Sequence, residues 1–327
     1  MAEGAAASAP AGPGDVLARL RAGAATVAGR ARHVRIDEDA LGRLAGTLPA
    51  RAPALLPEEV PAGDADDMVA AIVAWNAVNF GSGWFPELRK RPGLSGSRTL
   101  ALAFSDHVAR TGAPTAEWLS RVDAATCATV FGQPHPGPVD DLLDLFARAW
   151  NDLGALLLDG AEGSATTLVA SAGGSAATLV ATLGAVPSFA DVAVHGEGAD
   201  AVEVPFHKRA QITVSHLARA FGDQGPGSFA GIGHLTAFAD NLVPHVLRMA
   251  GVLAYDPHLA ARIGRGDLLR PGSAEEVEIR ACALHAVELA ATARGVAPAT
   301  IDHELWQRGQ APEIKAVPRH RCRCPWY

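Results

Sequence analysis

Amphipathic helical periodicity recurs along most of this sequence, and clusters of Gly and Pro interrupt it at intervals. Ala is abundant and runs of β-branched residues are short, so local propensity favours helix almost everywhere between those clusters. Apolar residues fill 49% of the 327 positions, which is enough for a core of ordinary depth. We therefore predict a mainly α fold with at most one short β-hairpin, over residues 192–204, where polar and apolar residues alternate.

The chain is expected to contain a short tail and one domain. Residues 1–14 are an Ala, Gly and Pro tract that cannot bury enough surface to offset its ordering entropy, so we expect them to be disordered. Residues 15–327 are expected to form a single compact helical domain. Within it, a proline-punctuated linker ends at Asp64, which is placed to cap the helix that follows.

Charge and residue usage exclude several classes of partner. The formal net charge of -7 opposes binding to DNA or intact tRNA, whereas one or two local cations can still hold a single phosphate. No stretch is long and apolar enough to span a membrane, and the N-terminus lacks the pattern of a secretion signal. We therefore expect a cytoplasmic protein that binds a small molecule, with its oligomeric state left open.

We expect neither a metal nor a cofactor. The four cysteines are too few and too unevenly spaced for a disulfide framework. Cys322 and Cys324 are too close together for the usual zinc-binding turn, and His303 with His320 adds no familiar ligand spacing. The terminal segment, residues 318–327, is therefore predicted to be an extended strand that docks on the body of the protein.

The first candidate site follows a helix that ends near residue 80. In the sequence NFGSGWFP, residues 79–86, two glycines let the backbone turn tightly or come close to a bound group. The candidate ligand-binding residues here are Asn79, Phe80, Ser82 and Trp84. A second Gly-rich stretch, residues 171–175, lacks the Gly-Lys-Ser/Thr ending of a phosphate loop, and we interpret it as a junction between two helices.

Two adjacent cations mark the second candidate site. Pro205 suits the opening of a helix, which places Lys208 and Arg209 in its first turns. Cations at that end oppose the helix dipole, so a bound anion such as a phosphate would account for them together with the free backbone amides. The alternative is a solvated basic pair on the protein surface.

A proline defines the third candidate site. Pro244 lacks the N–H for a helical bond to Asp240 and displaces Val243 from helical geometry, so a helix must break just after Asp240. A new helix starting at Pro244 would leave the Asp240 carboxylate near its N-terminus, where negative charge is favoured. Asp240 is therefore a candidate functional carboxylate, flanked by Phe238 and Asn241. A simple helix cap is the alternative.

A fourth polar cluster opens the long helix predicted to end before Gly295. Ser273 and Glu276 fit a capping box, which gives Glu276 a structural task. Glu278 and Arg280 lie two residues apart and cannot share one helix face, so at most one of them lines the same pocket. We take Arg280 as the candidate.

Six segments occur in the order found in one family: NFGSGWFPELRKRPGLSG, VPFHKRAQI, LTAFADNLVPHVLRMAGVLAY, GSAEEVEIRACALHAVEL, IDHELW and PRHRCRCPWY. Together they make the chain, from about Asp64 onward, resemble the queuosine 5′-phosphate N-glycosidases, also called queuosine salvage proteins. The resemblance implies an all-α architecture similar to helix-hairpin-helix DNA glycosylases. It also implies release of the base queuine from queuosine 5′-monophosphate, for salvage into tRNA modification.

The resemblance assigns roles residue by residue. It places Asp240 on the family's key carboxylate and Lys208 on the lysine of its Lys-Arg-Ala-Gln motif. Asp302 and Trp306 match the Asp and Trp of the penultimate motif. With this substrate, Asp302 would accept a hydrogen bond from the base edge or pair with the side-chain ammonium of queuine.

The implied reaction passes through an oxocarbenium-like ribose, so it needs fixed negative charge beneath the sugar and help for the departing base. Asp240 would supply the charge or act as general base toward water. A deazaguanine lacks the ring nitrogen at position 7, so an acid must act elsewhere on the base, and the sequence does not identify it. Lys208 and Arg209 would clamp the 5′-phosphate, and the residues that would stack on the base are Phe80, Trp84, Phe238 and Trp306.

The chain also departs from the family pattern. Asn241-Leu242 stand where many relatives carry Tyr-Arg, and His245 stands where many carry Gln, which affects recognition of the base more than cleavage of the bond. Two other functions remain as alternatives. One is a deazaguanine nucleotide-binding protein without turnover, and the other is a DNA-repair glycosylase, which the acidic balance disfavours.

Overall fold

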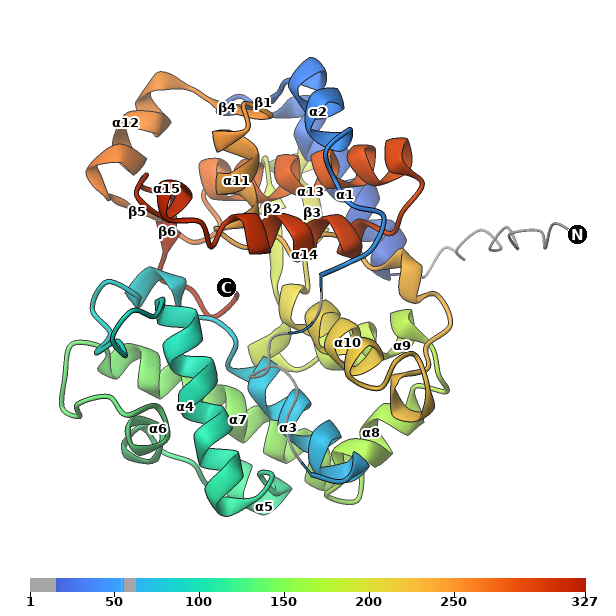
Figure 1. The fold of residues 1–327 in the computed structure, drawn as a ribbon, viewed down its shortest axis with the longest axis vertical. Helices are drawn as coiled ribbons and strands as arrows, with labels where there is room; N and C mark the ends of the chain where they lie inside the picture. Colours follow the sequence, from blue (N-terminus) through green and yellow to red (C-terminus); the bar gives the residue numbers. More distant parts are fainter. Residues whose placement is uncertain (1–15, 54, 56–62) are drawn as a thin grey trace, which may run out of the picture.

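The computed structural model describes residues 16–53, 55 and 63–327. The tail expected over residues 1–14 lies outside this part of the chain. Helices dominate, as predicted (Figure 1). Those of the first half are α1 (Val16–Arg30), α2 (Glu38–Ala45), α3 (Ala65–Ala77), α4 (Gly96–Thr111), α5 (Ala116–Leu119), α6 (Ala124–Phe131), α7 (Asp140–Gly160) and α8 (Ala165–Ser171). Within the described residues, no helix is long and apolar enough to cross a membrane.

The second half continues with α9 (Ala176–Gly184), α10 (Lys208–Ala220), α11 (Val243–Met249), α12 (Pro257–Arg265), α13 (Ala274–Arg294), α14 (Pro298–Arg308) and α15 (Pro312–Lys315). Short 3-10 helices occur at η2 (Ser82–Trp84), η3 (Pro187–Phe189), η4 (Gly198–Asp200), η5 (Gly225–Gly227) and η6 (Ile232–His234). The Gly-rich residues 171–175 join α8 to α9, and the Ser175 side chain caps α9, which confirms the predicted helix junction.

Local capping rules explain where several helices begin and end. Asp64 accepts hydrogen bonds from the N–H groups of Asp66 and Asp67 at the start of α3. Ser273 accepts from the Glu276 N–H at the start of α13, as the capping box predicts. Gly295 ends α13 in the left-handed conformation.

The β structure is more extensive than predicted. The expected hairpin is present as β2 (Val192–His195) paired antiparallel with β3 (Val202–Pro205). Two further pairs join strands that are far apart in the sequence: β1 (Val34–Ile36) runs antiparallel to β4 (Leu253–Tyr255), and β5 (Leu268–Leu269) runs parallel to β6 (Arg321–Cys322). These strands have two or three residues each, which is too short for an alternating pattern to be recognised.

Buried apolar side chains form two large clusters. The first cluster is built from helices α3 to α10. The second is built around α13, with α1, α2, α11, α12 and α14 packed about it. Figure 1 shows these two groups of helices in the lower and upper halves of the view, with the C-terminus between them. The single-domain organisation and the likeness to helix-hairpin-helix glycosylases stay predictions.

Candidate active site

A cavity encloses about 1020 Å³ of empty space, its open mouth included. The cavity brings together nine of the twelve residues predicted from the sequence: Asn79, Phe80, Ser82, Lys208, Phe238, Asp240, Asn241, Asp302 and Trp306. Trp84, Arg209 and Arg280 are not among its lining residues.

Arg209 points away from the cavity and serves the core. Its guanidinium donates to the main-chain oxygens of Ala77 and Ser188 and lies between the rings of Phe80 and Phe189, 4.7 and 4.8 Å from their centroids. Burial lowers the pKa of Arg209 to about 9. The neighbouring cations predicted from residues 208 and 209 therefore face different environments, because successive residues on a helix point in different directions.

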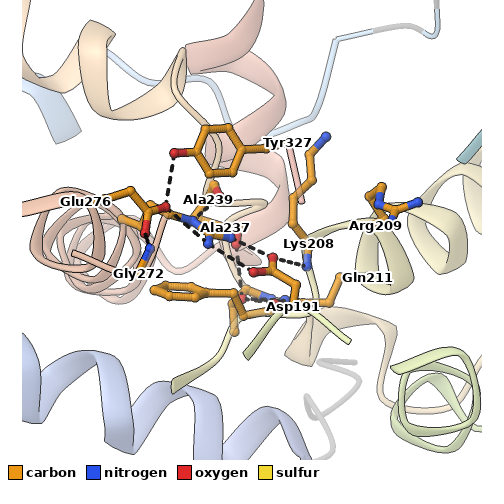
Figure 2. Close-up of polar contacts among 12 residues, drawn as sticks. Asp191, Lys208, Arg209, Gln211, Ala237, Ala239, Gly272, Glu276 and Tyr327 are labelled. Atoms are coloured by element: carbon orange, nitrogen blue, oxygen red, sulfur yellow. Dashed lines mark hydrogen bonds and ion pairs between the residues drawn. The ribbon is translucent and has the colours of Figure 1, made fainter. Parts of the chain in front are cut away.

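Arg280 belongs to a buried ionic network. It donates to both carboxylate oxygens of Asp191, at 2.9 and 2.6 Å, and lies 3.5 Å from Glu276 and 3.9 Å from the centroid of Phe206. The Tyr327 hydroxyl donates to the same Glu276 carboxylate at 3.0 Å. Figure 2 shows these contacts around Asp191, with the Arg209 side chain apart from them. Arg280 is therefore a structural residue of this network, which the charge pattern alone did not indicate.

Trp84 also lies behind the cavity wall. It is 3% exposed, and the Arg323 guanidinium lies 5.6 Å from its ring centroid. Its neighbour Gly83 packs so closely beneath the chain end that a Cβ there would lie 2.3 Å from the Cys322 carbonyl oxygen. The glycines of this segment thus allow residues 318–327, which we call the C-terminal strap, to dock as predicted.

The segment that carries Asp240 is not helical. A helix was expected up to Asp240, but the chain between η6 and α11 is irregular and buried. Side chains satisfy its backbone: Gln211 accepts from the Thr236 N–H at 2.9 Å, Asp302 accepts from the Phe238 N–H at 2.9 Å, and Arg280 donates to the Ala239 oxygen at 3.0 Å. Because buried backbone groups need partners, these three side chains position the segment that leads into Asp240.

Asp240 both caps a helix and faces the cavity. Its Oδ1 accepts from the N–H groups of Leu242 and Val243, at 2.7 and 3.1 Å, where α11 begins one residue before Pro244. The side chain is half-buried and lines the cavity. Among the described residues, Oδ2 makes no hydrogen bond, so this oxygen can interact with a ligand. The two roles weighed for Asp240 are therefore compatible.

Lys208 begins α10 and reaches the same part of the cavity. Pro205 ends β3 instead of opening the helix, so α10 starts three residues later than expected. The Lys208 backbone N–H donates to Asp191 at 3.3 Å, and its ammonium donates to the Asn79 main-chain oxygen at 3.1 Å. Burial lowers the pKa of Lys208, and attraction to Asp240 and then to Asp302 opposes this effect.

Asp302 extends into the cavity from α14 and is 3% exposed. Burial, followed by the negative charge of Asp240, raises the pKa of Asp302 to about 8. The Phe238 N–H and Lys208 partly oppose this rise. Two carboxyl groups thus share one cavity in contrasting surroundings.

The sequence analysis missed a group of cations on the cavity rim. Arg98, in the first turn of α4, and Arg319, on the C-terminal strap, both line the cavity. Among the described residues, Arg319 makes no hydrogen bond or ion pair. Burial lowers the pKa of Lys315 on α15, and the positive charges of Arg319 and Arg98 add to this effect. Two arginines therefore line the cavity, and Lys315 lies within electrostatic range of both.

Two histidines complete the wall beside Asp302 and were also missed. The Asn76 side-chain amide donates to the His216 Nδ1 at 3.2 Å, and His303 packs edge-on against Phe238 with ring centroids 5.4 Å apart. Burial lowers the pKa of His216 to about 3 and that of His303 well below its usual value, so both rings are neutral at physiological pH. They offer flat, uncharged surfaces to a ligand.

The remaining predicted residue, Asn241, lines the cavity and donates to the His320 main-chain oxygen at 3.1 Å. It therefore links the Asp240 segment to the C-terminal strap. All four cysteines are buried and free. In the part of the chain that the structure describes, no group of three or more His, Cys, Asp or Glu side chains is arranged to hold a metal ion.

The fold and the cavity define a mainly helical protein with a site that is lined by two carboxyl groups, a buried lysine and two arginines. Comparison with known families finds that residues 63–327 match the model of the queuosine salvage protein family. This range includes every residue that lines the cavity. The chain belongs to the queuosine salvage protein family.

Several curated relatives share one name, queuosine 5′-phosphate N-glycosylase/hydrolase. The protein of that name from Sphaerobacter thermophilus is 36% identical over 96% of this chain and 99% of its own length. The one from Mus musculus is 31% identical over 55% of this chain and 56% of its own, and the one from Dictyostelium discoideum is 32% identical over 63% of each.

Proposed function

We propose that this chain hydrolyses the N-glycosidic bond of queuosine 5′-phosphate and releases the base queuine. The names of its relatives support this substrate and this reaction. The single structural observation that carries the proposal is the shared cavity of Asp240, Lys208 and Asp302. This arrangement supports catalysis as well as binding, because it provides fixed charge and proton-transfer groups at one place.

Asp240 is proposed to act on the sugar. Cleavage of the bond leaves positive charge on the ribose, which a carboxylate held close to the anomeric carbon stabilises. Two backbone N–H donors fix Oδ1 and favour its negative charge, while Oδ2 can contact the ribose or orient the attacking water. The Lys208 ammonium, which is attracted to Asp240, would bind the sugar hydroxyls and so fix the position of the sugar relative to the Asp240 carboxylate.

The 5′-phosphate is proposed to bind at the cationic rim. We expected Lys208 and Arg209 to clamp it, but Arg209 faces the core and Lys208 lies with the two carboxyl groups. Arg319 and Arg98 line the cavity, and their positive charges lower the pKa of Lys315. A dianionic phosphate would relieve the mutual repulsion of these cations.

The base is proposed to lie against the aromatic side of the cavity. Phe238, Trp306 and the neutral ring of His303 line this region and provide flat surfaces for stacking. Phe80 also lines the cavity, but its ring packs edge-on against Phe146 and faces Arg209. We therefore assign Phe80 to the support of the site.

The test is incubation of the purified protein with queuosine 5′-monophosphate, followed by chromatographic measurement of free queuine. We expect multiple turnovers by the wild type and a loss on the order of 10³-fold in Asp240→Asn, because asparagine keeps an oxygen for the two backbone donors but removes the charge. Asp267→Asn is the matched control, since Asp267 forms an exposed ion pair with Arg265. Binding of the nucleotide without queuine release would leave only the binding-protein alternative, and unchanged turnover in Asp240→Asn would exclude its catalytic role.

A further inference from the structure

The departing base requires a proton, and this requirement rests on the proposed function. Cleavage of the bond sends its electron pair onto a ring nitrogen of the base. A 7-deazaguanine carries carbon at position 7, so the protonation at that site that assists ordinary purine departure is not available. An acid in the cavity must then deliver a proton elsewhere on the base.

The cavity contains two carboxyl groups with opposite surroundings. Asp240 is half-buried and accepts two backbone N–H bonds through Oδ1. Asp302 is 3% exposed and accepts one backbone N–H bond, from Phe238, through its own Oδ1. Its Oδ2 has no partner among the described residues and can carry a proton. Pairs of titratable groups held in opposite states are the usual arrangement of an acid and a base in one site.

The groups that face Asp302 support this division. Asp240 disfavours a second negative charge nearby, while Lys208 on α10 and the Phe238 N–H favour it. His216 on α10 and His303 on α14 are neutral because they are buried. The net result of burial and these charges is a pKa of about 8, so Asp302 is mostly protonated at neutral pH.

We propose that Asp302 is the general acid that protonates the departing base. Its location in the cavity beside Phe238 and Trp306 places its free oxygen near the surfaces expected to hold the base. Ionic pairing with the side-chain ammonium of queuine, one of the two roles expected from the sequence, would instead require a carboxylate.

The proposed step balances in atoms and charge. The bond between the anomeric carbon and the base nitrogen breaks, the electron pair goes to the base, and the Asp302 proton adds to that nitrogen to give neutral queuine. Water adds to the anomeric carbon and passes a proton to Asp240, which gives ribose 5-phosphate. A proton then returns from Asp240 to Asp302 through water at the cavity mouth, which restores both groups.

A change of leaving group separates an acid from a residue that only positions the substrate. Asp302→Asn keeps an oxygen for the Phe238 N–H but has no acidic proton. We expect kcat/KM on queuosine 5′-monophosphate to fall about 10²- to 10⁴-fold in this variant. On 4-nitrophenyl riboside 5-phosphate, whose leaving group departs without protonation, the loss should be under about tenfold. Glu304→Gln, two residues from Asp302 on α14 and paired with Arg308, is the control that should retain wild-type activity on both substrates.

The pH profile of the wild type provides a second measurement that does not depend on how well a variant folds. We expect kcat/KM on queuosine 5′-monophosphate to decline above about pH 8, as Asp302 loses its proton, and we expect this decline to be absent with the nitrophenyl substrate.

Equal losses on the two substrates in a folded Asp302→Asn variant, or a wild-type rate that does not fall through pH 9, would overturn the acid assignment. Absence of queuine release by the wild type would overturn the proposed function itself, so the two failures are distinguishable.

Discussion

Replacement of Arg319 by Gln should weaken the use of the 5′-phosphate while sparing the chemistry at the sugar. Arg319 lines the cavity, and among the described residues it has no carboxylate or carbonyl partner to lose. Burial lowers the pKa of Arg319 while Asp240 opposes that effect, so the side chain lies in partly desolvated surroundings where a phosphate contact is strong. A charge-assisted hydrogen bond of this kind contributes about 1.5–3 kcal/mol.

That range corresponds to a loss of about 10- to 150-fold in kcat/KM on queuosine 5′-monophosphate, at about 1.4 kcal/mol for each tenfold change. On dephosphorylated queuosine, the loss in Arg319→Gln should be under about threefold, because the contact is missing in both enzymes. The assay compares initial rates of queuine release on the two substrates. Ribose 5-phosphate should also raise the Tm of the wild type more than that of the variant.

Arg321→Gln is the matched control, since it removes the same charge two residues away. Arg321 donates to the Gly266 carbonyl at 2.8 Å and does not line the cavity. Equal losses on the phosphorylated and dephosphorylated substrates in Arg319→Gln would refute the phosphate assignment. So would a phosphate-specific loss of the same size in Arg321→Gln, because the effect would then reflect long-range charge alone.

Two further predictions concern the support of the site. Asp191→Asn should reduce the free energy of unfolding in urea by about 3–5 kcal/mol, because it removes the carboxylate that binds the buried Arg280 through both oxygens, whereas Arg265→Gln, at an exposed pair, should cost under about 1 kcal/mol. Similar losses of unfolding free energy in the two variants would show that the buried pair contributes no more to stability than the exposed one. Gly83→Ala should lower the Tm, by an amount that corresponds to about 1–3 kcal/mol, and raise KM, because the new Cβ displaces the C-terminal strap. Gly42→Ala, where no atom lies within 4 Å of the added Cβ, is its control, and an unchanged Tm in Gly83→Ala would contradict the close packing.

Local chemistry made several elements predictable. The proline rule placed a helix start beside Asp240, and the structure has α11 beginning at Val243 with Asp240 bonded to its first amides. The helix start at Ser273 and the hairpin could also be predicted, because the capping box and the alternating pattern each depend on residues that are close in the sequence.

Contacts between residues far apart in the sequence explain why some predicted residues do not line the cavity and why one that does was not predicted. Arg280 was a candidate for the cavity, and its bidentate partner, Asp191, lies 89 residues away in the sequence. Arg209 looked like part of a phosphate clamp because the carbonyls and rings that receive it come from other segments. Arg319 was visible in the terminal motif, but only the docking of the C-terminal strap brings it to the cavity. Residue type and spacing do not contain this information.

The irregular segment before Asp240 has a further consequence for how the site is built. A regular helix would satisfy its own backbone, whereas this segment depends on Gln211, Asp302 and Arg280 for partners. Asp302 can fulfil this task and still serve as an acid, because a protonated carboxyl group keeps a carbonyl oxygen that accepts the Phe238 N–H. When Asp302 gives up its proton, the same hydrogen bond becomes charge-assisted and stronger. If Asp302 acts as proposed, the backbone that leads to Asp240 would be held more firmly once the base has been protonated.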